Sequence, residues 1–569
     1  MNERATEPLY IGSTKQLFLD DFVVGQTYQV KRRFHRPVRF SANPIIKADQ
    51  PWEQGGTGVD ITGGTVLFDE IDQVFKMWYR TNQTIFEKTT DGRIREALGS
   101  AYVVCYAVSE NGEDWRKPNL GLTAFRGAAE NNILPPGDGG RSFIRRPNLI
   151  KDYADKDQSK RYKMVYLDEL EEGFALLTAY SSDGIHWRMN ADPPTVFQRP
   201  IIPNGILFGW DPNRREFVLY HRNAAMIPAD VDGRLVRNDL RQLLSSTSKD
   251  FHAWGQTEVA LSLDDRDPPD LDIGHLGILS AVLYTPDLYI GLLDTCTLHN
   301  VEDVDESLWE SFYKMDHREH RQELVISRDR KSWQRVAPNW EFFKPGLQGH
   351  WDDNHVIPVK PIVFDDSIWI FYSGSNLSCK SYLPAKLDFA AHPNPNHDRP
   401  ACAIGLAKMR LDGFVSYEGY QDEGWLETRT FMFEGDRLFV NARVPGLPFN
   451  SQNDQEVIFE GDRTSVRPKA HVDVSSDVRA FGALKIQIED QEGEPLPGFT
   501  ESDCDQWTGD EVSRVVTWGG NHDLSLLRGK PIRVRFHLRN AALYSFQFAS
   551  DERGRMGPEL ACPGCRQLD

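Results

Sequence analysis

The chain has 569 residues, of which 40% are hydrophobic and 11% aromatic, and its formal net charge is −19. That length fits about three or four domain-sized units, or a repeat architecture in which each unit adds its own layer. The acidic balance excludes the Lys/Arg-rich faces that nucleic acids require, and it disfavours binding to an anionic membrane surface.

The chain shows no targeting or membrane segment. No apolar run approaches the ~20 residues that span a bilayer, and residues 1–8 lack an apolar signal region. We therefore expect a cytoplasmic protein without a membrane partner, or a secreted one if a leader has been removed. The seven Cys are scattered and odd in number, as in reduced proteins. Cys562 and Cys565 form a lone C-x-x-C, which predicts a frayed tail more readily than a metal site.

Short strands dominate the pattern along the chain. Leu17–Phe22 predicts a first strand, for which we consider a ring-closing role, and residues 32–58 predict a loop rich in Pro and Gly. From Ile61 to Tyr417, β-branched and aromatic runs without helical spacing recur in sets of four. The runs expected as second strands look alike: Phe75–Arg80, Tyr162–Tyr166, Phe217–Tyr220 and Ile368–Tyr372.

A hairpin pattern that runs from a Ser to a Trp ends four of these sets. Its copies are Ser109–Trp115, Ser181–Trp187, Ser248–Trp254 and Ser327–Trp333. Asn-Gly and Asp-Gly in the first two copies are strong turn signals, and we expect each Trp to pack over its turn. A hairpin every ~70–80 residues is typical of a radial repeat, so the sequence predicts a five-bladed β-propeller.

Two further segments interrupt this repeat, and the pattern changes near its end. Residues 303–320 predict an inserted helix, and residues 376–400 predict a long surface loop. After about Gly424 the strands alternate strictly, as in Ile532–Leu538, which predicts an antiparallel β-sandwich. The expected division is a propeller over 1–423, a sandwich over 424–551 and a tail over 552–569.

Several segments carry a resemblance to known proteins: Leu17–Asp21, Phe75–Tyr79, Asp183–Trp187, Pro495–Trp518 and Leu543–Phe546. With them the chain resembles the furanosidase-type glycoside hydrolases of families 32 and 43, and its C-terminal part looks most like family 32. The resemblance spans nearly the whole chain. It implies a propeller followed by a sandwich, a carbohydrate substrate and a catalytic pocket around the propeller axis.

The catalytic motifs of family 32 are altered in this chain. The family places its nucleophile in an Asn-Asp-Pro-Asn stretch, where the comparable carboxylate here is Asp60 without that motif. Its Arg-Asp-Pro motif corresponds to Arg145-Arg146-Pro147, and its Glu-Cys acid motif is missing from the strand that begins at Pro203. These departures point away from a fructosidase.

Topology offers a second way to select site residues. In an up-and-down blade, first-strand starts and second-strand ends share one face, and the resemblance places the pocket on that face. We expect Asp60 as nucleophile or base and Glu169 or Asp272 as acid, because glycoside cleavage needs two carboxyls. Candidate substrate-binding residues are Trp52, Arg80, Arg145, Arg146, Asp168, His221, Arg222, His275, Asp294, Asp353 and His355.

Ordinary structural roles compete with each of these assignments. Trp52 is either a sugar platform or a packed aromatic, and a charge at a strand end is usually solvated or caps a turn. His275 and His355 are either core histidines or ligands of an axial calcium ion. We expect no required cofactor and no dedicated metal residues, and both structural calcium and a homo-oligomer stay open.

The leading hypothesis is a glycoside hydrolase that releases a terminal sugar by a two-carboxylate mechanism. For this hypothesis, Asp60→Asn should abolish turnover with little change in melting temperature. The alternatives are a non-catalytic carbohydrate-binding propeller, a transglycosylase or another sugar-active enzyme in the same pocket, and a protein-interaction module.

Overall fold

The computed structural model describes most of the chain. The described residues are 7–54, 58–83, 86–88, 94–96, 101–125, 127–135, 145–170, 173–190, 207–222, 226–231, 234–239, 242–262, 273–298, 318–338, 340–376, 402–445, 455–460, 463–468 and 482–550. The expected helix at 303–320 and the expected loop at 376–400 lie almost wholly outside them. The described residues form strands, turns and short 3-10 turns, with no α-helix, so the prediction of an all-β fold is confirmed.

The chain divides into two compact units. One takes its described residues from 1–36, 365–368 and 409–557, and the other from 37–364 and 369–408. We refer to them as the N/C unit and the central unit. This division differs from the expected one, because the first 36 residues belong with the C-terminal part of the chain and not with the repeat.

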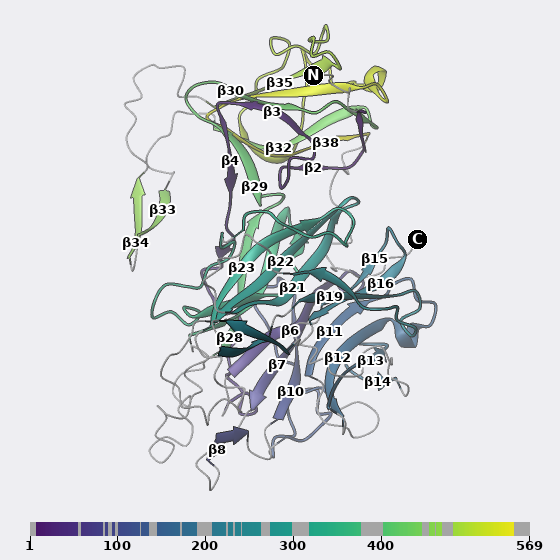
Figure 1. Ribbon diagram of the computed structural model, residues 1–569, viewed down its shortest axis with the longest axis vertical. Helices are drawn as coiled ribbons and strands as arrows, with labels where there is room; N and C mark the ends of the chain where they lie inside the picture. The colour runs from purple at the N-terminus through teal and green to yellow at the C-terminus, as the bar shows by residue number, and fades with distance from the viewer. Residues whose placement is uncertain are drawn as a thin grey trace. The chain divides into compact units, whose positions relative to one another are not determined.

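The central unit consists of five antiparallel groups of strands in chain order, which we call blades one to five (Figure 1). Three blades are separate four-stranded sheets, whereas blades one and five join edge to edge in one eight-stranded sheet. Blade one has β6 (Gly58–Asp69), β7 (Val74–Gln83) and β10 (Ala101–Ser109); blade two has β11 (Arg145–Lys151), β12 (Tyr162–Leu170), β13 (Gly173–Ser181) and β14 (Arg188–Met189); blade three has β15 (Leu207–Asp211), β16 (Glu216–Arg222), β19 (Leu243–Ser248) and β20 (Glu258–Leu261); blade four has β21 (Ile273–Thr285), β22 (Leu288–Leu298), β23 (Arg318–Ser327) and β24 (Gln334–Arg335); blade five has β25 (His355–Pro358), β26 (Ile362–Phe364), β27 (Ser367–Ser375), β28 (Cys402–Arg410) and β5 (Val38–Arg39).

Contacts link each blade to the next and the last to the first. Leu149 N donates to Thr65 Oγ1 (3.0 Å) between blades two and one, and the Tyr180 and Phe251 rings (centroids 5.3 Å apart) join blades two and three. Arg330 Nη2 donates to Glu216 Oε1 (2.6 Å) between blades four and three, and Ser280 Oγ donates to Pro358 O (3.0 Å) between blades four and five. Ile61 N donates to Ser373 Oγ (2.7 Å) between blades one and five. Five blades that contact one another in this cyclic order form a closed ring, which is the arrangement of a β-propeller.

The strand that completes blade five differs from the expected one. We expected Gly413–Tyr417 there, but β29 (Val415–Gly419) belongs to the N/C unit. The outer strand of blade five is β5, which pairs with β28 through Arg39↔Ala407 and Val38↔Lys408. Leu17 likewise pairs with Ser545 in the N/C unit. Ring closure therefore comes from Val38–Arg39 and not from Leu17–Phe22.

The Ser-to-Trp hairpins share one local geometry. In Ser181–Trp187, Ser181 Oγ accepts from Gly184 N (2.9 Å), Asp183 Oδ1 accepts from the backbone N of Ile185 and His186 (both 2.8 Å), and Trp187 Nε1 donates to Gly184 O (3.1 Å). The Trp packs over its own turn, as expected. The fourth position has positive φ in every copy, at Gly112, Gly184, Phe251 and Arg330.

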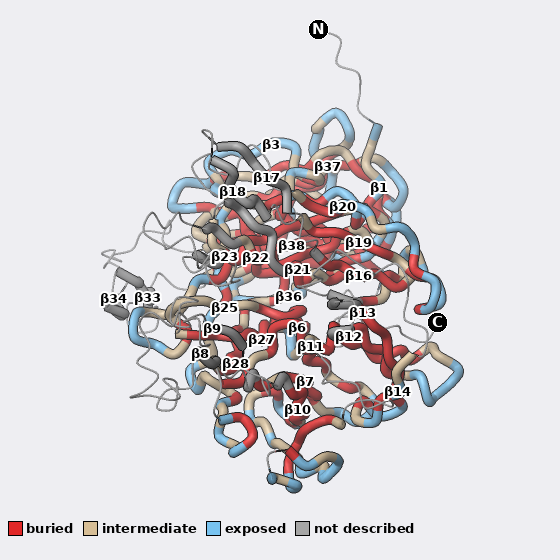
Figure 2. Tube along the Cα trace, turned by 60° about the horizontal axis from the view of Figure 1, so that its bottom comes forward, coloured by how far each residue is buried: buried red, intermediate tan, exposed pale blue. Residues whose placement is uncertain are grey.

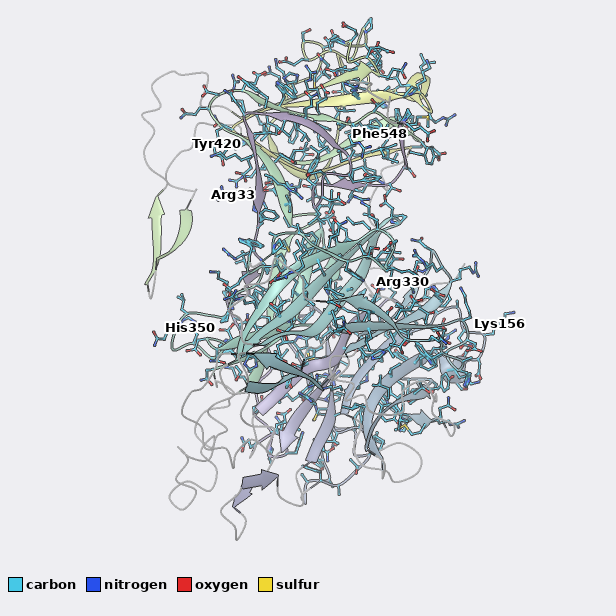
Figure 3. All side chains as sticks on the ribbon, in the orientation of Figure 1. Arg33, Lys156, Arg330, His350, Tyr420 and Phe548 are labelled. Atoms are coloured by element: carbon cyan, nitrogen blue, oxygen red, sulfur yellow. The ribbon has the colours of Figure 1, made fainter. Side chains whose placement is uncertain are left out.

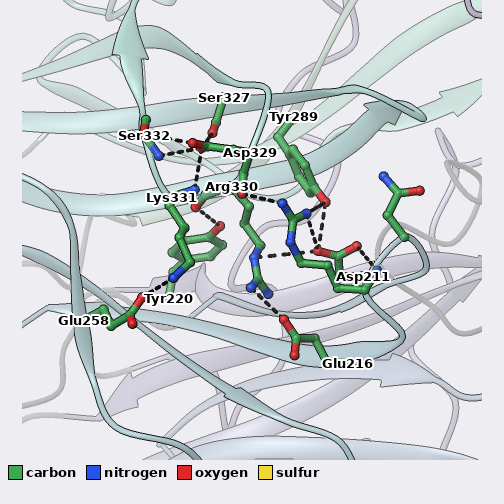
Figure 4. A network of polar contacts seen from close by, with 12 residues as sticks. Asp211, Glu216, Tyr220, Glu258, Tyr289, Ser327, Asp329, Arg330, Lys331 and Ser332 are labelled. Carbon is green, nitrogen blue, oxygen red and sulfur yellow. Dashed lines mark hydrogen bonds and ion pairs between the residues drawn. The ribbon is translucent and has the colours of Figure 1, made fainter.

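Arg330 adopts this conformation without being a glycine, and its side chain has ionic partners. Its φ is +66°, in the region that L-residues rarely adopt. The guanidinium extends to Glu216 and to Asp211 (Nε to Oδ2, 3.6 Å), and Tyr289 donates to the same Asp211 oxygen at 2.8 Å (Figure 4). These contacts run from blade four to blade three, so this hairpin joins two blades.

The N/C unit contains two six-stranded sheets. One has β1 (Leu9–Gly12), β31 (Phe431–Phe433), β37 (Ile532–Arg539), β30 (Gly424–Thr428), β3 (Val24–Tyr28) and β35 (Ala483–Asp490); the other has β36 (Gly509–Val515), β32 (Arg437–Val444), β38 (Ala541–Ala549), β29 (Val415–Gly419), β4 (Val30–Phe34) and β2 (Gln16–Leu17). Phe431 and Phe536 of the first sheet pack against Phe546 of the second, with ring centroids 6.1 and 5.3 Å apart. This is the layering of a β-sandwich, although β1 pairs with β31 in parallel.

Short hairpins and single turns complete the described elements: β8 (Phe86–Lys88), β9 (Ile94–Glu96), β17 (Met226–Val231), β18 (Arg234–Asp239), β33 (Gln455–Glu460), β34 (Arg463–Pro468), η1 (Gln158–Lys160) and η8 (Ser525–Leu527). Figure 2 shows buried residues along the strands of the blades and exposed residues in many of the turns. Within the described part of the chain, there is no helix whose length and apolar character would allow it to cross a membrane.

Candidate functional site

Asp60 lies near the start of β6 and is paired with Arg80 on β7. Arg80 Nε donates to Asp60 Oδ2 at 2.8 Å, and Arg80 Nη2 contacts the same oxygen. Asp60 Oδ1 accepts from Ser373 Oγ (2.6 Å) and from Thr62 N (2.5 Å). The Asp60 and Arg80 side chains are 14% and 13% exposed. A carboxylate with a fixed orientation therefore sits where the inner strand of blade one begins.

The Asp60 carboxyl is held in its ionised form. Burial alone would raise its pKa, because a charge is poorly solvated in the interior. The Arg80 guanidinium and the hydrogen bonds from Ser373 and Thr62 outweigh burial and hold the pKa of Asp60 far below its usual range. An ionised carboxylate can act as a nucleophile, a general base or an anchor for a cation, but it cannot donate a proton at neutral pH.

An irregularity in β6 turns its backbone next to Asp60. The pairing with β7 shifts register between Asp60 and Thr65. A Cβ on Gly64 would lie 2.3 Å from Trp78 O, and a Cβ on Gly63, where φ is +73°, would lie 2.8 Å from Arg146 Cβ. Glycine is therefore required at both positions. The bulge brings Thr62 N onto Asp60 and seats Arg146 of blade two against blade one.

Arg146 occupies a strained position at the start of blade two. Its φ is +56°, and the β11–β12 pairing shifts register between Arg145 and Asn148. Non-glycine residues in this region are uncommon and cluster at functional sites. Arg146 therefore stays a candidate binding residue, because its side chain lies beside Gly63, three residues after Asp60.

For five predicted site residues the structure gives the position of the backbone within a strand. Their partners on the neighbouring strand are given by the pairs Arg145↔Leu167, Asp168↔Ala175, Glu169↔Phe174, Arg222↔Leu243 and His275↔Cys296. The expected topology holds for them: Arg145 and His275 are near first-strand starts, and Asp168, Glu169 and Arg222 are near second-strand ends. Asp272 lies outside the described residues.

His221 and Asp294 are buried polar residues in second strands. His221 is fully buried, with its Nε2 3.4 Å from Ser246 Oγ. Asp294 is 3% exposed, and its Oδ1 accepts from Gln322 Nε2 at 2.7 Å. Both fit a hydrogen-bonded interior, whereas the expected alternative to substrate binding for a charge at a strand end was a solvated or turn-capping group.

The packing of Trp52 fits the packed-aromatic interpretation better than the sugar platform. Trp52 is 9% exposed, packs in the hydrophobic core of blades one and five, and donates from Nε1 to Asn132 Oδ1 at 2.8 Å. A stacking platform must present a ring face to its ligand, and this one is covered by protein.

Asp353 and His355 lie at the start of blade five. Asp353 accepts from Gly349 N at 2.6 Å within a turn, which is the capping role that competed with substrate binding. His355 is half-buried and begins β25, where it pairs with Ser375. Among the predicted site side chains that the structure describes, Asp60 and Arg80 contact each other directly.

Sequence reasoning missed Ser373 and Glu53. Ser373 lies on β27 of blade five, 313 positions from the Asp60 carboxylate that it orients, so no local signal could identify it. Glu53 is fully buried in a segment expected to be a loop. It accepts from Tyr79 Oη and from Lys117 Nζ (both 2.6 Å); burial raises its pKa, while Lys117 acts in the opposite direction.

The described residues contain one cluster that could hold a metal ion, and its members belong to the N/C unit. Glu423, Glu501 and His537 of the N/C unit bring one ligand atom each within 4.8 Å of one another. Lys485 Nζ, 2.9 Å from Glu501, competes for that carboxylate. The axial calcium considered for His275 and His355 is not tested by these contacts.

Comparison with known proteins gives no family. No family model matches the chain, and no curated protein matches it. Similar solved structures include a glycosyl hydrolase from Bacteroides ovatus (14% identity, 66% of this chain and 94% of that one, TM-score 0.41). Others are an N-acetylgalactosamine deacetylase from F. plautii in complex with blood group B trisaccharide (14%, 68% and 96%, TM-score 0.40) and the catalytic domain of a Coprinopsis cinerea GH62 alpha-L-arabinofuranosidase (11%, 65% and 97%, TM-score 0.35).

All three TM-scores are below 0.5, so these likenesses decide neither fold nor activity. The three proteins also differ in reaction, since two are glycoside hydrolases and one is a deacetylase. The fold described above rests on the strand pairing of this chain, and activity has to be argued from its own site residues.

Proposed function

We propose that the chain is a glycoside hydrolase that removes a terminal sugar from a small glycoside or oligosaccharide. The observation that carries this proposal is Asp60, a carboxylate kept ionised and fixed in orientation by Arg80, Ser373 and Thr62 at the start of an inner propeller strand. The resemblance of chain segments to furanosidase-type hydrolases supports the same class.

In this proposal Asp60 is the nucleophile or the general base. Its ionised state suits attack on the anomeric carbon or on a water, and its partners keep the oxygens in place. The acid is Glu169 or Asp272, and Arg145 and Arg146 bind sugar hydroxyls or a substrate carboxylate. A carboxyl separation of about 5–5.5 Å would give retention, and about 6.5–9.5 Å inversion.

A non-catalytic carbohydrate-binding propeller is the second candidate. The observation that favours it is that protein donors already occupy both Asp60 oxygens. If Asp60 were the nucleophile, one of its oxygens would need a free lone pair to attack the anomeric carbon. If Asp60 only holds Arg80 in place, no free lone pair is needed. Arg146, where family 32 has an aspartate, favours this candidate too.

The experiment that separates these candidates measures release of aryl alcohol from a panel of nitrophenyl glycosides and of reducing sugar from oligosaccharides. Hydrolysis by the wild type, with at least a ~10³-fold loss of kcat in Asp60→Asn, is expected. Asp157→Asn is the matched control, because it removes an exposed turn-capping carboxylate from the same unit and should keep activity.

Folding of each variant is followed by circular dichroism. Full activity in a folded Asp60→Asn variant would exclude Asp60 as the catalytic carboxylate. Sugar binding on a glycan array without hydrolysis of any bound sugar would favour the binding protein.

Product analysis in H₂¹⁸O distinguishes hydrolysis from sugar transfer, because only hydrolysis places the label on the released sugar. The proposed chemistry uses carboxyl groups alone. We therefore expect activity to persist in EDTA, and a loss that calcium restores would instead indicate a structural ion.

A further inference from the structure

A pocket lined by both polar and apolar residues lies in the N/C unit, on the sheet that contains β32, β38, β29 and β4. Its volume is about 360 Å³, within the range of about 300–1,000 Å³ typical of small-molecule sites. Its lining includes Arg33, Arg443, Glu418, Tyr420, Tyr544 and His35. None of these residues is part of the site proposed around Asp60, which belongs to the central unit.

Strand register explains why these side chains converge. Arg443 on β32 pairs with Ala542, Ala542 pairs with Glu418, and Glu418 pairs with Lys31 on β4. Cross-strand partners share one face of a sheet, and Arg33 lies on the same face as Lys31 because side chains alternate along a strand. Arg33 and Arg443 thus stand on strands three spacings apart, about 14 Å between backbones. Their side chains can reach toward each other over Ala542.

A bulge shapes the wall of this pocket. Along β38 the pairing passes from Asn441↔Ser545 to Ala442↔Leu543, which leaves Tyr544 as the extra residue. A bulge redirects a side chain, and here it presents Tyr544 to the pocket. The Tyr544 ring lies 5.5 Å from the His35 ring and 4.7 Å below the Arg410 guanidinium, and His35 Nε2 lies 2.8 Å from Ser416 Oγ.

Tyr420 forms an accessible aromatic surface at the rim. It is 45% exposed, and Lys31 Nζ lies 5.4 Å from its ring centroid. Figure 3 shows Tyr420 and Arg33 on neighbouring segments of the same unit. An exposed ring beside hydrogen-bonding side chains can cover the apolar face of a sugar ring.

The charges in this pocket select among ligands. Two guanidiniums and one carboxylate line the pocket, with Arg33 Nη1 3.3 Å from Glu418 Oε2. A guanidinium matches the planar carboxylate group of a ligand and can bind it through two parallel hydrogen bonds. Glu418 would repel a multiply charged phosphate, but it can accept hydrogen bonds from hydroxyl groups. A singly charged ligand rich in hydroxyls fits both features.

We propose that the pocket between Arg33 and Arg443 binds a carboxylated sugar, such as a uronic acid residue, independently of the site at Asp60. The carboxylate lies between the two guanidiniums, the hydroxyl groups donate to Glu418, and the ring packs against Tyr420. The pocket is a binding site, with no bond made or broken in it.

Isothermal titration calorimetry on the full chain tests this proposal with sodium glucuronate, sodium galacturonate, glucose, acetate and inorganic phosphate. We expect at least one uronate to bind at least tenfold more tightly than glucose, acetate and phosphate. Equal binding of glucose would contradict the role of the carboxylate. Equal binding of acetate or phosphate, or no binding of either uronate, would overturn recognition of a sugar acid.

Three variants locate the site. Arg443→Gln and Arg33→Gln should each weaken uronate binding at least tenfold, and Ala542→Leu should do so by filling the floor without a change of charge. Arg514→Gln is the control, because Arg514 lies on β36 of the same sheet and outside the pocket, with Glu511 at 3.6 Å. Unchanged binding in folded Arg443→Gln and Ala542→Leu variants would exclude this pocket.

Asp60→Asn separates this proposal from the proposed function. It should abolish hydrolysis and leave uronate affinity unchanged, because Asp60 belongs to the other unit. Loss of uronate binding in Asp60→Asn, with retention in Arg443→Gln, would place the sugar acid in the central unit and overturn the inference.

Discussion

The indole nitrogen of Trp78 donates a hydrogen bond to Gly184 O at 2.7 Å, and Trp187 donates to the same oxygen at 3.1 Å. Trp78 lies on the second strand of blade one, whereas Trp187 ends the hairpin of blade two. A carbonyl oxygen has two lone pairs, so it can accept from both indoles. The carbonyl of one turn residue thus attaches the hairpin to its own blade and to the preceding one.

Gly184→Ala should destabilise the protein by the combined effects of backbone conformation and crowding. Gly184 has φ +79°, and an added Cβ would lie 2.7 Å from Trp78 Cζ2. We expect a loss of about 2–4 kcal/mol in the free energy of unfolding, measured by urea titration. Gly349→Ala is the matched control, with φ +86° and nothing within 4 Å, and should lose about 1–2 kcal/mol. Equal losses in the two variants would show that packing against Trp78 contributes nothing.

Asp60→Asn should lower stability as well as activity. The nearly unchanged melting temperature expected from the sequence alone did not take into account the ion pair with Arg80, which the structure shows to be largely buried. Removing one partner of a buried ion pair lowers the free energy of unfolding by about 3–5 kcal/mol. Because the Asp60–Arg80 pair is partly exposed, we expect a loss at or below the lower end of that range. The double variant Asp60→Asn/Arg80→Gln should recover part of the loss, as measured by thermal unfolding. Similar stability of the single variant and the wild type would show that Arg80 finds another partner.

Asp69 should contribute a pH-dependent part of the stability. Its buried carboxylate contacts Lys151 (2.6 Å), Lys76 (2.7 Å) and Tyr162 Oη (2.7 Å). Burial raises its pKa, but these three donors outweigh burial and lower it below the ordinary 3.8. A carboxyl with a depressed folded pKa stabilises the protein above its unfolded pKa, and this stabilisation is lost as pH falls.

We therefore expect Asp69→Asn to lower the free energy of unfolding by about 3–5 kcal/mol at pH 7. Below pH 4, the free energy of unfolding of this variant should depend less steeply on pH than that of the wild type. Urea unfolding at pH 7, 4 and 3 measures both effects. Asp72→Asn is the control, because Asp72 binds the same Lys76 but is 52% exposed, and should cost at most about 1 kcal/mol. Parallel pH profiles for the wild type and Asp69→Asn would exclude this carboxyl as the source.

Trp52 should affect folding and not sugar affinity. Trp52→Ala removes a buried indole from the core of blades one and five and should cost about 3–5 kcal/mol. Trp52→Phe keeps one aromatic ring and removes the hydrogen bond to Asn132 and part of the buried volume, so its loss should be smaller than that of Trp52→Ala. Thermal unfolding and KM on any hydrolysed glycoside check this. A tenfold higher KM at unchanged melting temperature would restore the platform assignment.

A fragment of residues 409–557 should not fold alone. Strands β1, β2, β3 and β4, all from the first 36 residues, pair with β31, β38, β30 and β29. Their removal leaves open edges on both sheets, which promotes aggregation. Circular dichroism and size-exclusion chromatography should show an unfolded or aggregated fragment, and fusion of residues 1–36 to its N-terminus should restore a folded monomer. A folded fragment without residues 1–36 would show that those strands are dispensable.

The sequence by itself determined the features that depend on neighbouring residues. The second strands, such as Val74–Gln83 and Glu216–Arg222, are recognisable because β-branched and aromatic runs favour extended backbone. The Ser-to-Trp hairpins are equally local, since Ser181, Asp183 and Trp187 bond to backbone atoms within a few residues. Counting these hairpins predicted the repeat, and the resemblance to furanosidase-type hydrolases was needed as well to select Asp60 and Arg80.

Only the tertiary structure decided which side chains meet. Ser373 orients Asp60 across 313 positions, Val38–Arg39 completes blade five, and Trp52 turns inward to Asn132. The two arginines of the pocket in the N/C unit are also far apart in sequence, on β4 and β32. Ring closure and sheet pairing bring such residues together, and burial then sets their charge states. Burial and charge depend on neighbours in space, which the order of residues along one strand does not specify.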